Sequence, residues 1–183
     1  MGRRTTATVA ALAGVVLVAS GCESDTNGTA TPSTTTDTSA ATAALWDPCT
    51  QVPDQQLQRI GVVSSTKKSG IAGVEQPGWK VCSWHDAASQ WNYSLGVWST
   101  IYSIDDLRKK PGNVDFVSIN VGGRDGFRFR NTSDVDGEDC DLAFPAGQGA
   151  LQITVFNTSP KGKVAPCDRA MNAAEVLVPT FPR

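Results

Sequence analysis

Cysteine is the residue type in this chain with the widest chemical repertoire, and five occur, at positions 22, 49, 82, 140 and 167. A zinc site would need closely paired cysteines such as Cys-x-x-Cys, and no such pair occurs. A cysteine nucleophile would need a general base, and the only histidine is His85. The spacing therefore favours disulfides or modified cysteines over metal binding or catalysis.

The N-terminus is typical of a secretory signal peptide. Arg3 and Arg4 precede an apolar run, residues 9–19, that is too short for a membrane-spanning helix. Small residues then lead to Cys22 in the order Ala-Ser-Gly-Cys, which is similar to a bacterial lipobox except for alanine at its first position. We expect a signal peptide over residues 1–21, cleavage before Cys22, and lipidation of the Cys22 sulfur. Two acyl chains there would anchor the protein stably to a membrane.

The segment that follows, residues 22–44, is rich in threonine and serine and contains no large apolar side chain. Such a composition cannot bury enough surface to offset the entropy of ordering, so a flexible tether is predicted. Large apolar residues begin at Leu45 and Trp46 and continue to the C-terminus. Residues 45–183 are therefore expected to form one globular domain.

The remaining four cysteines all lie in that domain, and an even number in an exported protein predicts two disulfides with three possible connectivities. We favour Cys49–Cys82, which would join the N-terminal helical segment to the first strand. The complementary pair, Cys140–Cys167, would hold the C-terminal helix to a late strand.

His85 has Ser83 and Asp86 close by, which raises the question of a hydrolase. Neighbouring residues of a strand point to opposite faces, so adjacency in sequence does not assemble a catalytic triad. The chain also lacks the Gly-x-Ser-x-Gly nucleophile motif. We predict no catalytic residues and no enzyme activity, with an envelope hydrolase as the alternative.

Residues 134–141 contain five carboxylates, of which Asp134, Asp136 and Asp139 could form a weak calcium site. An EF-hand loop has glycine at its sixth position and glutamate at its twelfth, and here Gly137 is fourth. We interpret the segment as a solvated acidic turn, expect no metal site, and keep weak calcium binding as an alternative. The stretch Gly-Gly-Arg-Asp-Gly, residues 122–126, lacks the lysine of a phosphate-binding loop and is predicted to be a tight turn.

Aromatic residues crowd positions 79–102. On the predicted strand 91–100, Trp91, Tyr93, Leu95 and Val97 share one face, and Trp98 is out of phase with them. Aromatic side chains on both faces are typical of core packing. The more specific hypothesis is an aromatic platform for a glycan or lipid, with basic side chains nearby for anionic groups. Its candidate binding residues are Trp98, Arg124, Arg128 and Arg130.

Local patterns predict three short helices, at residues 53–60, 103–110 and 166–178. Strands are predicted at 79–86, 91–100, 114–121 and 126–130, and a final hairpin around 140–144 and 151–155. This order predicts an α+β fold: a single domain with an antiparallel β-sheet, two or three short helices packed mainly on one face, and two disulfides.

The small net charge of the chain does not indicate a highly charged binding partner such as nucleic acid. Lysine and arginine number 16 against 18 acidic residues, and removal of Arg3 and Arg4 with the signal peptide leaves 14 against 18. A mildly acidic domain does not attract nucleic acid, so no nucleic-acid partner is expected.

Several stretches resemble a known family: Asp47–Cys49, Val81–Trp84, Ile119–Phe127, the isolated Cys140 and Pro166–Leu177. They are similar to the secreted actinobacterial lipoprotein family called domain of unknown function 3558, which includes some mycobacterial Lpr-type lipoproteins. The resemblance covers most of residues 46–178. It implies an envelope lipoprotein with paired cysteines and provides no catalytic residues.

Together these observations predict a lipid-anchored lipoprotein on the extracytoplasmic face of the cell membrane. Its folded part is expected to be a monomeric, non-enzymatic binding or accessory domain without a cofactor. The expected partners are the membrane, through the lipid on Cys22, and an envelope lipid, a glycan or a membrane protein.

Overall fold

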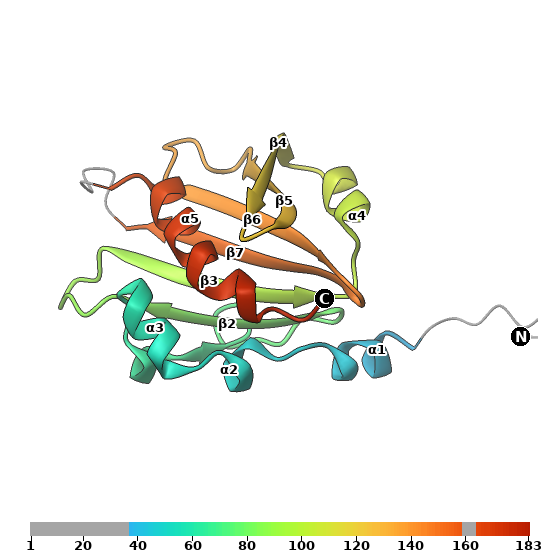
Figure 1. Ribbon diagram of the computed structural model, residues 1–183, viewed down its shortest axis with the longest axis horizontal. Coiled ribbons are helices and arrows are strands. Elements are labelled where there is room, and N and C mark those ends of the chain that lie inside the picture. The colour runs from blue at the N-terminus through green and yellow to red at the C-terminus, as the bar shows by residue number, and fades with distance from the viewer. Residues whose placement is uncertain (1–36, 159–163) are drawn as a thin grey trace, which may run out of the picture. The chain divides into compact units, whose positions relative to one another are not determined.

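The computed structural model describes residues 37–158 and 164–183 of the chain (Figure 1). Their centre is a seven-stranded sheet in the order β1-β2-β3-β7-β6-β5-β4, with every pair of neighbouring strands antiparallel. All described residues belong to one compact unit, Thr35–Arg183. The strands are β1 (Lys68–Ser69), β2 (Trp79–His85), β3 (Tyr93–Thr100), β4 (Asn113–Val121), β5 (Arg124–Asn131), β6 (Asp139–Ala146) and β7 (Gly149–Asn157).

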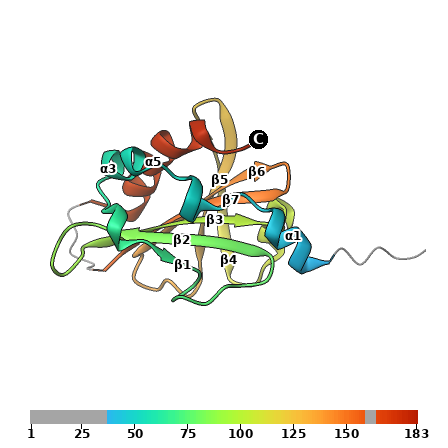
Figure 2. The same ribbon diagram turned by 90° about the horizontal axis from the view of Figure 1, so that it is seen from below.

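Short helices connect and cover this sheet, which confirms the predicted α+β fold. Figure 2 shows α3 and α5 on the same side of the sheet. None of the helices in the described residues is long and apolar enough to span a membrane. They are α1 (Thr38–Ala44), α2 (Pro48–Gln51), α3 (Asp54–Ile60), α4 (Ile104–Lys109), α5 (Pro166–Leu177) and two 3-10 turns, η1 (Ser64–Thr66) and η2 (Val178–Thr180).

The two faces of the sheet carry different side chains because successive residues of a strand alternate between them. Val97, Ile153 and Leu142 lie opposite one another in the register, are fully buried and belong to the main core beneath α5. We call this side the α5 face. Their sequence neighbours Trp98 and Gln152 also lie opposite each other and point to the other side, which we call the open face.

Helix α5 can approach the sheet closely because its inner side consists of small residues. Ala170, Ala173 and Ala174 are fully buried, and Leu177 fills the space at the C-terminal end of the helix. Burying a leucine side chain contributes about 1.5–3 kcal/mol. This helix, Pro166–Leu177, confirms the helix predicted at residues 166–178.

Helix α4 is the helix that packs on the open face. It begins with a cap at Ser103, whose hydroxyl accepts a hydrogen bond from the Asp106 backbone N–H at 3.2 Å. The Asp106 carboxylate in return accepts from the Ser103 backbone N–H at 2.9 Å, which completes a capping box. Leu107 anchors the helix in a small second core with Phe129 and Ala143.

The hairpin between β4 and β5 turns at Gly122 and Gly123, whose φ angles are 58° and 79°. Val121 pairs with Arg124 across these two residues, so the loop is a tight two-residue turn, as predicted. Two successive positive φ angles explain the glycine pair, because most other residues reach this region only with strain.

The structure differs from the expected tether at its C-terminal end. Residues 38–44 form α1, which is capped by Asp37 through its side chain and the Ser39 N–H. Two contacts hold this helix to the domain: Thr42 Oγ1 accepts from the Gly78 N–H at 2.7 Å, and Lys80 Nζ donates to the Ala43 carbonyl at 3.3 Å. The rest of the predicted tether lies outside the described residues, apart from Asp37.

The other differences from the predicted elements concern segments too short to show a helix or strand pattern in the sequence. Helix α2 is a single turn started by the Asp47 side chain and Pro48, and strand β1 contains two residues. Trp91, expected on a strand face, precedes β3 and is 39% exposed. Short elements of this kind are held by tertiary contacts more than by local propensity.

Candidate functional site

A groove of about 420 Å³ lies on the open face of the sheet, beside α4. Its floor comes from β3, β6 and β7, and its walls come from β2, β5, α4 and the loop before β2. It therefore draws residues from distant parts of the chain, as ligand sites commonly do. The lining includes Trp79, Trp98, Lys110, Phe129, Asp139, Asp141, Gln152 and Thr154.

Aromatic rings form part of the lining. Trp79 and Trp98 meet edge to face, with ring centroids 5.9 Å apart and planes at 85°. The indole of Trp98 lies over Gly96, where a Cβ atom would be 2.8 Å from Trp98 Nε1. Glycine at position 96 thus makes room for the indole against the strand backbone. On the β5 side, Phe129 stacks on Phe116 at 4.8 Å between centroids.

Polar groups form the floor between these rings. Thr154 Oγ1 donates to the Asp141 carboxylate at 2.6 Å. Two buried atoms of the groove lining have no hydrogen-bond partner among the described residues: Trp98 Nε1, which is a donor, and Gln152 Oε1, which is an acceptor. Gln152 is only 7% exposed, so its unpaired oxygen is shielded from bulk water. Such unsatisfied buried atoms are uncommon and call for an explanation.

The groove has a negative electrostatic character at its β6 side. Burial, reinforced by the charges of Asp134, Asp141 and Glu138, raises the pKa of Asp139 to about 6. Burial also raises the pKa of Asp141, an effect opposed by the Thr154 hydrogen bond and by the charge of Lys110. Lys110 lies across the groove, with its Nζ atom 5.7 Å from the centre of the Trp79 ring.

The arginines proposed to accompany Trp98 lie on the opposite face of the sheet. The register Trp98–Gln152–Ala143–Phe127 follows the open face, so Arg128 belongs with Leu142 on the α5 face. Arg124, four positions before Arg128, and Arg130, two positions after it, fall on that same face of β5. The sheet therefore separates all three arginines from Trp98, and the predicted combined site does not form.

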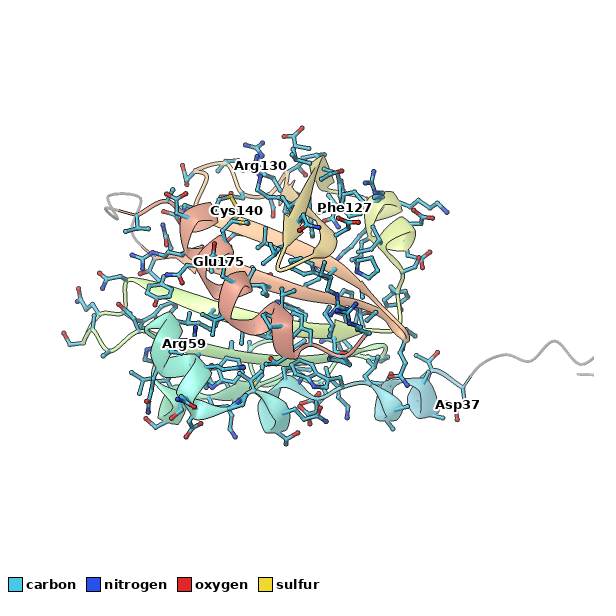
Figure 3. All side chains as sticks on the ribbon, in the orientation of Figure 1. Asp37, Arg59, Phe127, Arg130, Cys140 and Glu175 are labelled. Carbon is cyan, nitrogen blue, oxygen red and sulfur yellow. A yellow bond between two sulfur atoms is a disulfide. The ribbon has the colours of Figure 1, made fainter. Side chains whose placement is uncertain are left out.

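Each of these arginines has surroundings of its own. Arg124 binds the C-terminal tail, donating from Nη2 to the Pro182 carbonyl at 2.8 Å and from Nη1 to the Phe181 carbonyl at 3.4 Å. Arg130 pairs with Asp115 at 3.3 Å on the surface, and Figure 3 labels its side chain near the outer edge of the sheet. Arg128 is exposed. Arg124 thus has a structural role that its sequence context did not reveal.

Among the described residues, His85 forms no hydrogen-bonded triad with Ser83 and Asp86. Its ring stacks on Trp91 with centroids 5.5 Å apart, and its Nδ1 lies 2.8 Å from the backbone oxygen of Asp86. The Asp86 carboxylate accepts from the backbone and side-chain nitrogens of Asn92, at 2.8 and 2.7 Å. The Asp86 carboxylate is therefore bound to Asn92 and not to the imidazole, while Ser83 and His85, two residues apart on β2, line one small pocket.

The acidic segment forms a turn in which Asp134 binds backbone. Its two carboxylate oxygens accept from the N–H groups of Glu138 at 2.9 Å and Asp139 at 3.2 Å. In the part of the chain that the structure describes, no three carboxylate, histidine or cysteine side chains are grouped to hold a metal ion. Asp134, Asp136 and Asp139 thus do not converge as the calcium alternative requires.

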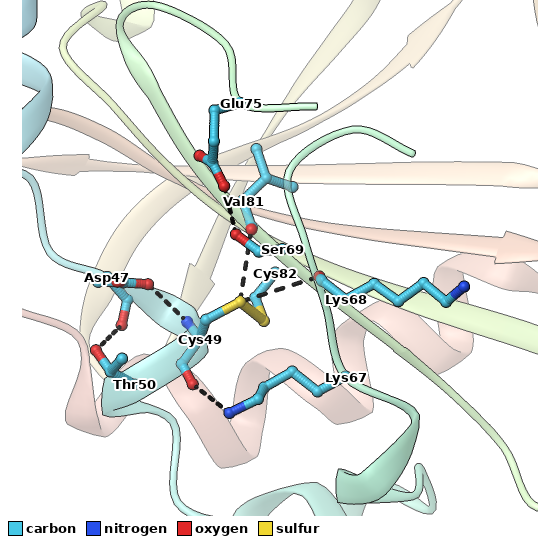
Figure 4. The surroundings of a disulfide bond; sticks show 9 residues. All are labelled: Asp47, Cys49, Thr50, Lys67, Lys68, Ser69, Glu75, Val81 and Cys82. Carbon is cyan, nitrogen blue, oxygen red and sulfur yellow. Dashed lines mark hydrogen bonds between the residues drawn. A yellow bond between two sulfur atoms is a disulfide. The ribbon is translucent and has the colours of Figure 1, made fainter. Parts of the chain in front are cut away.

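Both favoured disulfides are present, Cys49–Cys82 and Cys140–Cys167, each with Cα atoms 5.0 Å apart. Figure 4 shows the first one beside α2, where the Asp47 carboxylate accepts from the Cys49 N–H at 2.9 Å and Lys67 Nζ donates to its carbonyl at 3.1 Å. Figure 3 shows the sulfur atoms at Cys140 beside the first turn of α5. The bridges hold α2 to β2 and α5 to β6, on the α5 face. Cys22 and the signal peptide, residues 1–21, lie outside the described residues.

Sequence reasoning identified Trp98 but missed the residues that the fold brings to it. Gln152 and Thr154 alternate with Leu151, Ile153 and Val155, and this alternation is the signal that they face away from the main core. Their meeting with Asp141 depends on β6–β7 pairing, and the opposition of Gln152 to Trp98 depends on the insertion of β7 beside β3. No local pattern reports that insertion.

The comparisons with known proteins agree with the resemblance in the sequence. A family model described as "Protein of unknown function (DUF3558)" matches residues 17–180, which include both disulfides and the whole groove lining. Searches of curated proteins and of solved structures gave no match. The family match spans most of the sequence, and the chain therefore belongs to the family described as Protein of unknown function (DUF3558).

Proposed function

We propose that this protein is a lipid-anchored lipoprotein of the cell envelope whose folded domain binds an envelope ligand without acting on it. The groove on the open face is the observation that carries the binding proposal. It combines aromatic rings, desolvated carboxyls and two unpaired buried polar atoms in a volume of about 420 Å³. Small-molecule sites commonly have volumes of about 300–1,000 Å³ and a few convergent polar groups.

The anchoring proposal rests on the N-terminal sequence. Small residues precede Cys22 as in a lipobox, and a short apolar run precedes them. Two disulfides suit an oxidising compartment outside the cytoplasm. In this proposal the protein is a monomer on the extracytoplasmic face of the membrane, related to actinobacterial Lpr-type lipoproteins, and the ligand is an envelope lipid or glycan or a membrane protein.

The non-enzymatic character is supported by the surroundings of His85. Its ring stacks on Trp91, and the Asp86 carboxylate that a catalytic triad would need binds Asn92 instead of the imidazole. The groove itself contains carboxyls and amides but not this histidine. A binding role needs only complementary contacts, and the groove provides them.

The anchoring is tested by expressing the full chain in an actinobacterial host and measuring the mass of its N-terminal peptide. We expect a peptide that begins at Cys22 and carries acyl chains, together with a membrane-bound protein. The variant Cys22→Ala should be processed elsewhere or retained as precursor, and should carry no lipid. An unmodified N-terminus on the wild-type protein would contradict the anchoring proposal.

The binding role is tested by native mass spectrometry of the protein purified from its own envelope in mild detergent. We expect a mass increment that is lost when Trp98 is replaced by alanine. A co-purifying protein that persists in the Trp98→Ala variant would place the interaction outside the groove and contradict this part of the proposal.

A further inference from the structure

We propose that the groove on the open face binds an uncharged saccharide ring, with one sugar hydroxyl bridging Trp98 Nε1 and Gln152 Oε1. This inference rests on the proposed function, since it names the chemistry of the ligand for the same groove. The terminal sugar of a glycan and the headgroup of a glycolipid present the same chemistry.

The first argument comes from the two unpaired atoms. Trp98 and Gln152 lie directly opposite each other on β3 and β7, so both atoms belong to the same cross-strand pair. One atom is a donor and the other an acceptor. A hydroxyl group can accept from the indole N–H and donate to the amide oxygen at the same time. Pairing both atoms removes the cost of leaving them unsatisfied.

The second argument comes from the aromatic rings beside these atoms. A sugar ring has polar hydroxyls at its edge and C–H groups on its faces, so it requires a polar contact next to an apolar one. Trp79 and Trp98 provide ring surface at one side of the groove, next to Thr154 and Asp141, and the buried Phe129 ring closes the other side. The electron-rich face of an aromatic ring attracts such C–H groups.

The third argument comes from the charges that face the groove. Strand β6 contributes Asp139 and Asp141, and the charges of Asp134 and Glu138 in the preceding turn act on Asp139. Lys110, which follows the last residue of α4, is the single basic side chain in the lining. Carboxylates accept hydrogen bonds from hydroxyls and repel anions, which favours an uncharged sugar over a phosphate or uronic acid.

Two other ligand classes fit less well. An acyl chain would bury Gln152 and Asp141 without giving them partners, which is unfavourable. An organic ammonium group would satisfy the carboxylates, but it has no lone pair to accept a hydrogen bond from Trp98 Nε1. The unpaired donor therefore distinguishes a hydroxyl from an ammonium group.

The test uses the indole N–H resonances of the chain, which contains five tryptophans. The protein is produced with Cys22→Ala to remove the lipid acceptor, labelled with ¹⁵N, and the Trp98 signal is assigned with Trp98→Phe. The probes are the methyl hexopyranosides of glucose, galactose and mannose and the disaccharides maltose and cellobiose. We expect at least one probe to shift the Trp98 signal in a saturable way at concentrations up to about 100 mM.

The variant Gln152→Leu separates a ligand contact from a structural role. Because it removes a buried acceptor that has no partner in the protein, we expect the variant to melt at the same temperature as the parent or higher. Its affinity for the sugar should fall at least about fivefold. Gln58→Leu, on the exposed side of α3, is the matched control and should leave the affinity unchanged. A folded Gln152→Leu protein with unchanged affinity would overturn the proposal.

Three further outcomes would also overturn it. They are the absence of any Trp98 shift with the whole probe set, a shift with tetramethylammonium larger than that with any sugar, and equal affinity for glucuronate and methyl glucoside. If native mass spectrometry finds a retained ligand without sugar, the saccharide inference fails and the binding proposal stands. A glycan and a glycolipid headgroup are distinguished by comparing the affinities for methyl glucoside and for octyl glucoside below its micelle concentration. Higher affinity for the octyl form indicates a glycolipid headgroup.

Discussion

The replacement Asp139→Asn should make the domain more stable at neutral pH, and it tests the electrostatics of the groove without any ligand. Asp139 has a pKa of about 6 in the folded protein against an ordinary value of 3.8, because of burial and then the charges of Asp134, Asp141 and Glu138. Between these two values the folded state binds more protons than the unfolded state. Stability therefore decreases as the pH rises from about 4 to about 7.

The magnitude follows from this shift. A displacement of about two pKa units corresponds to about 3 kcal/mol between full protonation and full ionisation. Asp139 is only half-buried, so solvent screening reduces the effect to about 1 kcal/mol. The asparagine variant carries no charge at this position and should escape the loss. Among the described residues, Asp139 hydrogen-bonds Asp134 through its backbone N–H and not through its side chain, so the replacement breaks no side-chain hydrogen bond.

Urea unfolding of wild type and Asp139→Asn, followed by tryptophan fluorescence at about pH 4.5 and about pH 7.5, measures the effect. We expect the free energy of unfolding of the variant, relative to wild type, to be about 1 kcal/mol larger at the higher pH than at the lower pH. Asp136→Asn is the control, because it removes the same charge from the same turn at an exposed position. Identical pH profiles for wild type and Asp139→Asn would refute the assignment of an unfavourable, desolvated carboxylate to the groove.

Three further changes probe the scaffold. Replacing Cys140 and Cys167 by alanine opens a loop with a sequence separation of 27 and should cost about 3.5 kcal/mol, measured by urea unfolding. Gly126→Ala should cost about 2 kcal/mol, seen as a lower melting temperature, because its Cβ would lie 2.6 Å from the Phe144 ring and 2.7 Å from a backbone oxygen. Arg124→Gln should cost about 1–2 kcal/mol and speed amide exchange in the C-terminal tail, since it removes donors to the carbonyls of residues 181 and 182.

Each of these changes has a matched control. Reduction of the wild-type protein breaks both disulfides, so it should lower the free energy of unfolding by at least as much as the Cys140 and Cys167 replacements do. Gly123→Ala, where no atom lies within 4 Å of the added Cβ, isolates backbone strain from steric overlap. Arg128→Gln, at an exposed position on the same strand, should leave stability and tail exchange unchanged. Equal effects at positions 124 and 128 would show that the tail contacts do not stabilise the domain.

Much of the fold could be predicted because its signals are local. The capping box at Ser103, the paired glycines at 122 and 123, and the apolar side of α5 each depend on residues a few positions apart. The disulfides could be predicted from cysteine number and from the elements they would join. In contrast, α1, α2 and β1 were missed because their short sequences carry little intrinsic preference and they are held by contacts with the domain.

The site shows where local reasoning stops. Alternation along β3 was enough to predict that Trp98 points away from Val97, and alternation along β5 groups Arg124, Arg128 and Arg130 on one side. Alternation does not say which side of one strand matches which side of another. That match depends on the pairing of β3 with β7, β7 with β6 and β6 with β5, and it places Trp98 and the arginines on opposite faces.

The amino-acid sequence by itself therefore determined the α+β class, both disulfides, the family and the orientation of each strand's side chains within that strand. The tertiary structure decided which of those side chains meet. The pairing of β3 with β7 places Trp98 opposite Gln152 and Gly96 opposite Thr154, and the pairing of β7 with β6 places Thr154 opposite Asp141. Arg124 lies against the C-terminal tail. The reason is physical: periodicity is a property of one segment, but a groove is made by the order and register of several, and these are selected by the packing of the whole core.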